Sequence, residues 1–166
     1  MIAMYPCFDV DGILVERLLI KWNWLMTGSF RLLAVNPFGD HFLSSAQGTI
    51  LLLDVSSGEI ATIADSEEAF RKRVAELANQ NEWFLLEDER RAAQKGYVPG
   101  KAECIGAKIP WVFKESAAMP DNLYVADLYE YVAFMGDLHR QISDVANGGK
   151  VQLRVEPEPR KSRVDH

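Results

Sequence analysis

Residues 36–60, NPFGDHFLSSAQGTILLLDVSSGEI, alternate short apolar runs with polar turns. The segments SAQG and VSSG each place a glycine where a short hairpin loop needs a left-handed backbone, so the three flanking strands are expected to pair antiparallel. The run from Ile50 to Leu53 has no polar face. A strand that is buried on both faces has no reason to alternate. We therefore expect this strand at the centre of a sheet that a helix covers on at least one side.

Other segments are expected to extend the sheet. FRLLAV at 30–35 is a short apolar run that Pro37 closes, NLYVAD at 122–127 precedes a helical pattern, and GGKVQLRV at 148–155 could add an edge strand. Residues 96–121 contain three prolines and three glycines and show no clean period. So long an irregular connection in a small domain is often functional.

Apolar residues at helical spacing predict helices at about 11–26, 66–79, 81–96 and 128–142. Asp11, Asp65 and Asp127 are the expected N-caps, the last two in Asp-x-x-Glu boxes, and Gly96 is the expected stop of the third helix. The positions expected to face the core in the first two helices are Leu14, Leu18, Trp22, Leu25, Phe70, Val74 and Leu77.

These patterns predict an α+β fold, with a mainly antiparallel sheet formed by a β-meander around residues 30–63 plus later strands, packed against three to four helices. A chain of 166 residues with 48% hydrophobic residues suits one compact domain. We expect that domain over residues 1–155, followed by a charged, loosely held C-terminal tail at 156–166.

Charge and composition exclude several classes of protein. A net charge of −6 argues against a nucleic-acid binder, which needs a concentrated positive surface, and suits a partner with a basic face. No apolar run is long enough to span a bilayer, and the first residues lack a secretory pattern, so a cytoplasmic location is expected. Cys7 and Cys104 are the only cysteines and are expected to be reduced thiols.

The motifs of common catalytic and metal sites fail on particular residues. PGKAECIG lacks the glycine and the Ser or Thr of a phosphate-binding loop at Lys95 and Ala102. No nucleophile signature surrounds Cys104, and no zinc spacing joins it to His41 or His139. We therefore expect no catalytic residue, no metal and no cofactor.

Two residues of the irregular segment are candidates for binding. Lys108, beside glycine and proline in GAKIP, would line a surface groove, although a solvated lysine is the simpler interpretation. Trp111 is the tryptophan most expected at the surface. His139 lies at the margin of the last helix's apolar stripe, where hydrogen-bonded packing is the simpler interpretation.

Several motifs in order, over about residues 36–145, resemble one family. They are the Phe38-Gly39-Asp40 turn, the hairpin GTILLLDVSSGEI, the Lys108-Ile109-Pro110 loop and the helix end His139-Arg140-Gln141. Together they resemble the C-terminal domain of the immunity proteins that protect bacteria against type VI secreted DNase effectors, long catalogued as a domain of unknown function. The larger N-terminal domain common in that family is mostly missing, so the chain resembles a stand-alone version.

The resemblance implies a non-enzymatic immunity protein that neutralises a nuclease-type toxin by direct binding, with neither nucleic acid nor membrane as a direct partner. We expect binding at Asp40, Lys108, Trp111 and His139, which a compact fold could bring to one end of the sheet. Asp40 would act on association and Trp111 on dissociation. Exposed loop aromatics are also compatible with a homodimer. The alternatives are a small-molecule-binding or minor enzymatic domain with a groove near residues 96–121, and an orphan mobile-cassette protein of unrelated role.

Overall fold

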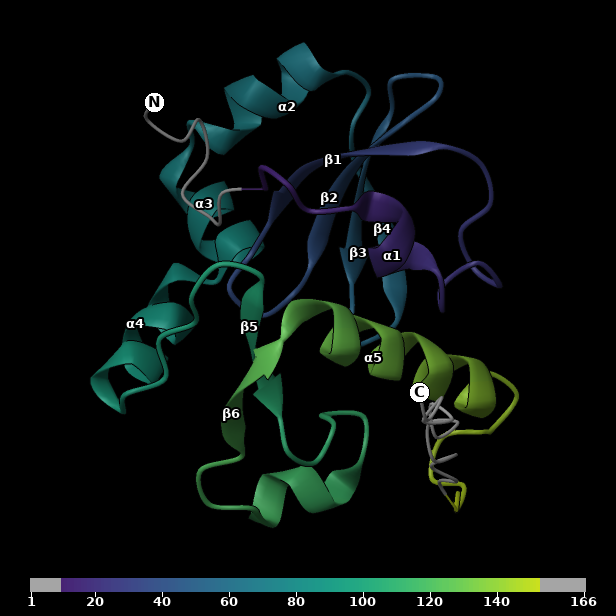
Figure 1. Cartoon of the computed structure of the whole chain (residues 1–166), viewed down its shortest axis with the longest axis vertical. Helices are drawn as coiled ribbons and strands as arrows, with labels where there is room; N and C mark the ends of the chain where they lie inside the picture. The colour runs from purple at the N-terminus through teal and green to yellow at the C-terminus, as the bar shows by residue number, and fades with distance from the viewer. Residues whose placement is uncertain (1–9, 153–166) are drawn as a thin grey trace, which may run out of the picture.

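The structure, a computed structural model, describes residues 10–152 and has an α+β fold (Figure 1). Both of its sheets, of four and two strands, are antiparallel, so the predicted class is confirmed. The elements in this part of the chain are α1 (Val15–Leu19), β1 (Phe30–Val35), β2 (His41–Ser45), β3 (Ile50–Asp54), β4 (Glu59–Ala64), α2 (Glu67–Val74), α3 (Leu77–Phe84), α4 (Leu86–Gln94), β5 (Glu103–Ala107), the 3-10 helix η1 (Lys114–Ala118), β6 (Leu123–Asp127) and α5 (Leu128–Ile142).

The β-meander forms as the sequence predicts. The strand order is β1-β2-β3-β4, which makes β3 an inner strand. Gly48 and Gly58 have φ of +85° and +74° in the two hairpin turns, a backbone that glycine adopts without strain. The turn at Gly48 therefore fixes the register in which His41 faces Leu53 and Leu43 faces Leu51.

The apolar run of β3 is explained by helices on both faces of the sheet. Leu51 and Leu53 belong to a core with α1 and α5, whereas Ile50 and Leu52 belong to a second core with α2 and α3. Figure 1 shows α1 and α5 crossing in front of the sheet. Ile50 and Leu53 are fully buried, and the two residues between them are half-buried. The strand consequently has no solvent face, as its sequence indicates.

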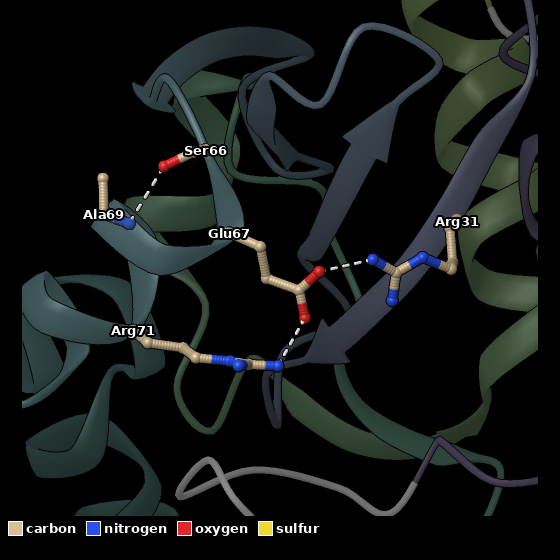
Figure 2. Close-up of polar contacts among 5 residues, drawn as sticks. All are labelled: Arg31, Ser66, Glu67, Ala69 and Arg71. Carbon is tan, nitrogen blue, oxygen red and sulfur yellow. Dashed lines mark hydrogen bonds and ion pairs between the residues drawn. The ribbon is translucent and has the colours of Figure 1, made fainter.

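The α2 helix begins one residue later than predicted. Ser66, rather than Asp65, is the N-cap, and its hydroxyl accepts a hydrogen bond from the Ala69 amide at 3.1 Å (Figure 2). Glu67 then bridges Arg31 of β1 and Arg71 one turn further along the helix. The first turn of α2 is thereby tied to the edge strand β1.

The predicted helices at 66–79 and 81–96 are wrong in their boundaries. The side-chain amides of Asn79 and Gln80 donate to the carbonyls of Arg73 and Val74, so α2 ends there and Leu77 is 69% exposed. A further break follows at Leu85, whose φ is +52°. The stop at Gly96 is confirmed, with φ of +90°.

The predicted helix at 11–26 is reduced to one short helix followed by turns. Trp22 Nε1 donates to the Val132 carbonyl at 2.9 Å, and a Cβ on Gly136 would lie 2.7 Å from the Lys21 carbonyl oxygen. This close approach to α5 fixes the backbone of residues 20–25 more strongly than helix propensity does. Asp11 consequently caps no helix, because Leu14 is the N-cap. Leu14 and Leu25, both predicted to face the core, are exposed.

Residues 96–121 are more ordered than predicted, because they contain β5 and η1. β5 pairs with β6 in a separate two-stranded sheet, so the later strands do not extend the meander. The Ile105 amide donates to the Pro37 carbonyl at 2.8 Å and so attaches this sheet to the β1–β2 turn. The cap of α5 is confirmed, since Asp127 accepts from the Glu130 amide.

Some predictions fall at or beyond the ends of the described chain. Residues 148–152 form no strand, contrary to the predicted edge strand, and its remaining residues 153–155 lie outside the described part. Cys7 and the tail at 156–166 lie outside it as well. Within residues 10–152, no helix has both the length and the apolar character needed to cross a membrane.

Candidate functional site

The candidate site begins at the β1–β2 turn, which Asn36 organises. Its amide oxygen accepts from the backbone amides of Phe38 and Asp40, and its amide nitrogen donates to the Trp83 carbonyl at 3.0 Å. The same nitrogen donates to Asp40 Oδ2 at 2.8 Å. Asn36 is fully buried, so this network holds the Asp40 carboxyl in one orientation.

Asp40 is a buried acid with a strongly perturbed pKa. Its other oxygen, Oδ1, accepts from the Val55 amide at 3.0 Å, and the residue is 7% exposed. Burial and, next, the negative charge of Asp54 raise the pKa of Asp40 to about 7, against the hydrogen bonds from Asn36 and Val55. The carboxyl therefore changes its charge near neutral pH.

Asp40 and Asp54 form one end of a cleft of about 540 Å³ at the end of the four-stranded sheet. Asp54 ends β3, and its Oδ1 accepts from the amides of Ser56 and Ser57 at 2.9 and 3.1 Å. Its carboxylate is thus fixed by the β3–β4 turn, as that of Asp40 is fixed by the preceding turn.

The α4 helix forms one wall of this cleft and the connection between β5 and β6 forms the other. The residues of the α4 wall are Leu85, Asp88, Arg91, Ala92 and Lys95, and those of the opposite wall are Trp111, Met119, Asp121, Asn122 and Leu123. The αL backbone at Leu85 sets the direction of α4, and the Asn122 side chain exchanges hydrogen bonds of 2.7 and 2.8 Å with the backbone of Ile109. Both walls are therefore held by specific local contacts.

The charges of the cleft are unevenly matched. Its two cations already have acidic neighbours at the surface: Arg91 lies 3.8 Å from Asp88, and Lys95 lies 3.4 Å from Asp121. Within the described residues, neither Asp40 nor Asp54 makes a salt bridge. A cationic group entering the cleft would therefore meet two carboxyls that no protein cation neutralises.

The four predicted binding residues lie in three places. Asp40 and Trp111 line the same cleft, and Trp111 is 49% exposed, which confirms its expected place at the surface. Lys108 is exposed beside the cleft, where its amide donates to the Asn122 carbonyl at 3.2 Å, but it does not line the cleft. His139 lines a neighbouring cleft instead.

His139 is nonetheless linked to Asp40 through a single residue. Its Nε2 lies 2.9 Å from the carbonyl oxygen of Val55, whose amide donates to Asp40. His139 is buried, and burial lowers its pKa although the Val55 carbonyl and the charge of Asp54 oppose the change. The hydrogen-bonded packing that its sequence position indicates is confirmed.

The other reactive side chains considered from sequence lie inside the protein. Burial, reinforced by nearby carboxylates, raises the pKa of Cys104 to about 12, so the thiol stays protonated at neutral pH. Burial lowers the pKa of His41 to about 4, and neither ring nitrogen has a hydrogen-bond partner in the described structure. The backbone of Gly39 and Asp40 is close enough to favour the charged ring, yet lies outside hydrogen-bond geometry. Among residues 10–152, no three His, Cys, Asp or Glu side chains are grouped as metal ligands would be.

Sequence reasoning missed Asn36, Asp54 and the α4 wall. Asn36 carries a usable signal, because an Asn before Pro often starts a turn. The α4 wall has none, since its charged residues have the pattern of a solvated helix. No family model matches the sequence, and no curated protein matches it either.

Proposed function

We propose that this chain is a non-enzymatic binding protein that neutralises a basic bacterial toxin of the type VI nuclease-effector class. It would do so by direct contact at the cleft of about 540 Å³ that Asp40 and Trp111 line. The observation that carries the proposal is the pair of carboxyls, Asp40 and Asp54, at a cleft whose own cations are already paired. The net charge of −6 and the resemblance of residues 36–145 to immunity proteins support the same partner class.

A basic side chain of the partner would complete the electrostatics of the cleft. An arginine or lysine that enters it would lie beside Asp40 and Asp54 and favour the ionised form of Asp40. Trp111, half-exposed at the rim, offers the large, rigid apolar surface that is typical of residues that dominate binding energy.

Because Asp40 is buried, its expected effect on the binding rates differs from the effect on association that was predicted from sequence. Truncating one partner of a buried, hydrogen-bonded charge pair acts mainly on dissociation, whereas charges at a rim act on association. We therefore expect Asp40 to control the dissociation rate. The net charge of −6, rather than Asp40 by itself, is then expected to attract a basic partner during association.

The test is a binding measurement between the purified chain and the protein encoded beside its gene, where that protein is a secreted nuclease. We expect Asp40→Asn and Trp111→Ala each to weaken binding by about 30-fold, or ~2 kcal/mol. Asp65→Asn is the matched control, because this exposed aspartate follows the far end of β4. Unchanged affinity in both cleft variants, with the variants folded, would place the interface elsewhere.

The size of the cleft favours a second candidate, a small-molecule-binding or minor enzymatic domain. About 540 Å³ falls within the usual range of small-ligand sites, and a carboxyl that titrates near neutral pH suits acid–base work. A ligand that co-purifies with the chain and is lost from Trp111→Ala would favour this candidate over the toxin partner.

A further inference from the structure

A second cleft, of about 520 Å³, adjoins the first near the end of α5. It lies between the segment before β1, the β3–β4 turn, the segment before η1 and the end of α5 with the residues that follow it. Near the β3–β4 turn it is lined by His139 and Gly58, and a Cβ on that glycine would lie 2.7 Å from the imidazole ring.

The second cleft gathers several large, exposed hydrophobic side chains among polar groups. Five of the twelve large hydrophobic side chains that are exposed in the described chain line this one cleft: Trp24, Leu25, Val112, Val145 and Val151. Their exposed fractions lie between 36% and 39%. Apolar side chains concentrated in one hollow mark an interaction site more often than scattered ones do.

The two clefts lie side by side, separated by two short stretches of backbone. Ser56 lines the first cleft and Ser57 the second, while Trp111 lines the first and Val112 the second. The ridge between the clefts is therefore made of adjacent residues from two connections. Val55 fixes this ridge from inside, since it bonds Asp40 on one side and His139 on the other.

We propose that the two clefts form one docking surface for a single segment of a partner protein. A basic side chain of that segment enters the first cleft beside Asp40, and neighbouring apolar side chains of the same segment cover Val112 and Val145 in the second. The inference rests on the proposed function and adds to it the second cleft and the chemistry of the bound segment. Charge complementarity selects the basic residue, and the adjacency of the clefts across a ridge of sequence-adjacent residues favours one segment over two separate ligands.

A second copy of the chain is a poorer occupant of this surface. Each copy carries a net charge of −6 and presents the same unmatched carboxyls, so two copies repel each other where the clefts would meet. A small apolar molecule would account for the second cleft alone and would leave Asp40 and Asp54 unmatched.

The test is a selection from a displayed library of random linear peptides on the full chain, followed by affinity measurement with the enriched peptides. We expect enriched peptides to combine an arginine or lysine with a nearby group of aliphatic or aromatic residues. Affinity for one such peptide should fall about tenfold or more in both Asp40→Asn and Val145→Asp. Val98→Asp is the matched control, because Val98 is 67% exposed and lines neither cleft. Trp111→Ala serves as a second variant of the first cleft if Asp40→Asn does not fold.

The remaining outcomes separate the two proposals. Peptides that respond to Asp40→Asn and Trp111→Ala but not to Val145→Asp would overturn the joint surface and leave the first cleft as the binding site. Peptides that respond only to Val145→Asp would overturn both proposals. A library with no peptide sensitive to either cleft would overturn the joint surface, as would a dimer of the chain that Val145→Asp dissociates.

Discussion

Asp40→Asn should change how the stability of this protein depends on pH. The pKa of Asp40 rises from its ordinary value of 3.8 to about 7 on folding, chiefly through burial. The folded chain therefore holds a proton that the unfolded chain has lost between these two values. The free energy of unfolding consequently falls as the pH rises through this window, and the stabilisation from the bound proton is fully present only below the unfolded pKa.

The size of the effect follows from the pKa difference. A difference of about 3 corresponds to about 4 kcal/mol over the whole window, and linkage places about 2–3 kcal/mol of it between about pH 5 and 8. An asparagine at this position does not ionise and loses none of this stability. Its amide would, however, face the Asn36 donor that now bonds Asp40, which lowers stability by about 1–3 kcal/mol at every pH.

The assay is urea unfolding followed by tryptophan fluorescence at about pH 5 and about pH 8. Asp40→Asn should be less stable than the natural chain at the lower pH and should match or exceed it at the higher pH. Asp65→Asn, a change at an exposed carboxyl, should leave the pH dependence unaltered. A stability difference between Asp40→Asn and the natural chain that stays constant with pH would show that Asp40 titrates at its ordinary pKa, and the reasoning would be wrong.

Two further substitutions test local parts of the structure. Gly58→Ala should lower the free energy of unfolding by about 2–5 kcal/mol, measured by heat or urea, because the backbone is left-handed and the new Cβ would clash with the His139 ring. Gly48→Ala is the control and should lower it by only about 1–2 kcal/mol, because its Cβ would meet nothing within 4 Å. Equal losses of stability in the two variants would mean that the His139 ring moves freely. Ser66→Ala should lower stability by about 1 kcal/mol in the same assay, and a larger loss for Asp65→Ala would show that the sequence-based cap was the correct one.

The strands of the β-meander were predictable because their signals are local. The apolar run of β3 and the glycines of its two turns depend on residues within two adjoining hairpins, and the turns set which residues pair except at the register shift between Ile50 and Leu51. The sequence did not predict β5, because the glycine at position 106 interrupts the short apolar pattern of this strand. A Cβ there would lie 2.8 Å from the Tyr131 ring, so the glycine reflects packing against α5 rather than a turn.

The helix boundaries failed where distant contacts outweigh local preference. Apolar spacing alone would continue a helix through Trp22. Its indole instead donates a hydrogen bond to the Val132 carbonyl of α5, more than a hundred positions away. Asn79 and Gln80 likewise end α2 by bonding its last carbonyls, although neither residue breaks the apolar pattern. A side chain that bonds a distant or preceding backbone group leaves no trace in hydrophobic periodicity.

The candidate site, too, could be predicted from sequence only in part. Asp40 and Trp111 could be selected from sequence, because Asp40 is the acidic residue of the Phe38-Gly39-Asp40 motif and Trp111 lies in a long irregular connection. Val55 could not be selected in this way, because its aliphatic side chain neither forms hydrogen bonds nor reacts. Yet its amide orients Asp40 and its carbonyl holds His139. The β3–β4 turn thus fixes both clefts through backbone groups, which every residue except proline supplies in full. A search of side-chain motifs finds the carboxyl of such a site and misses the peptide groups that position it.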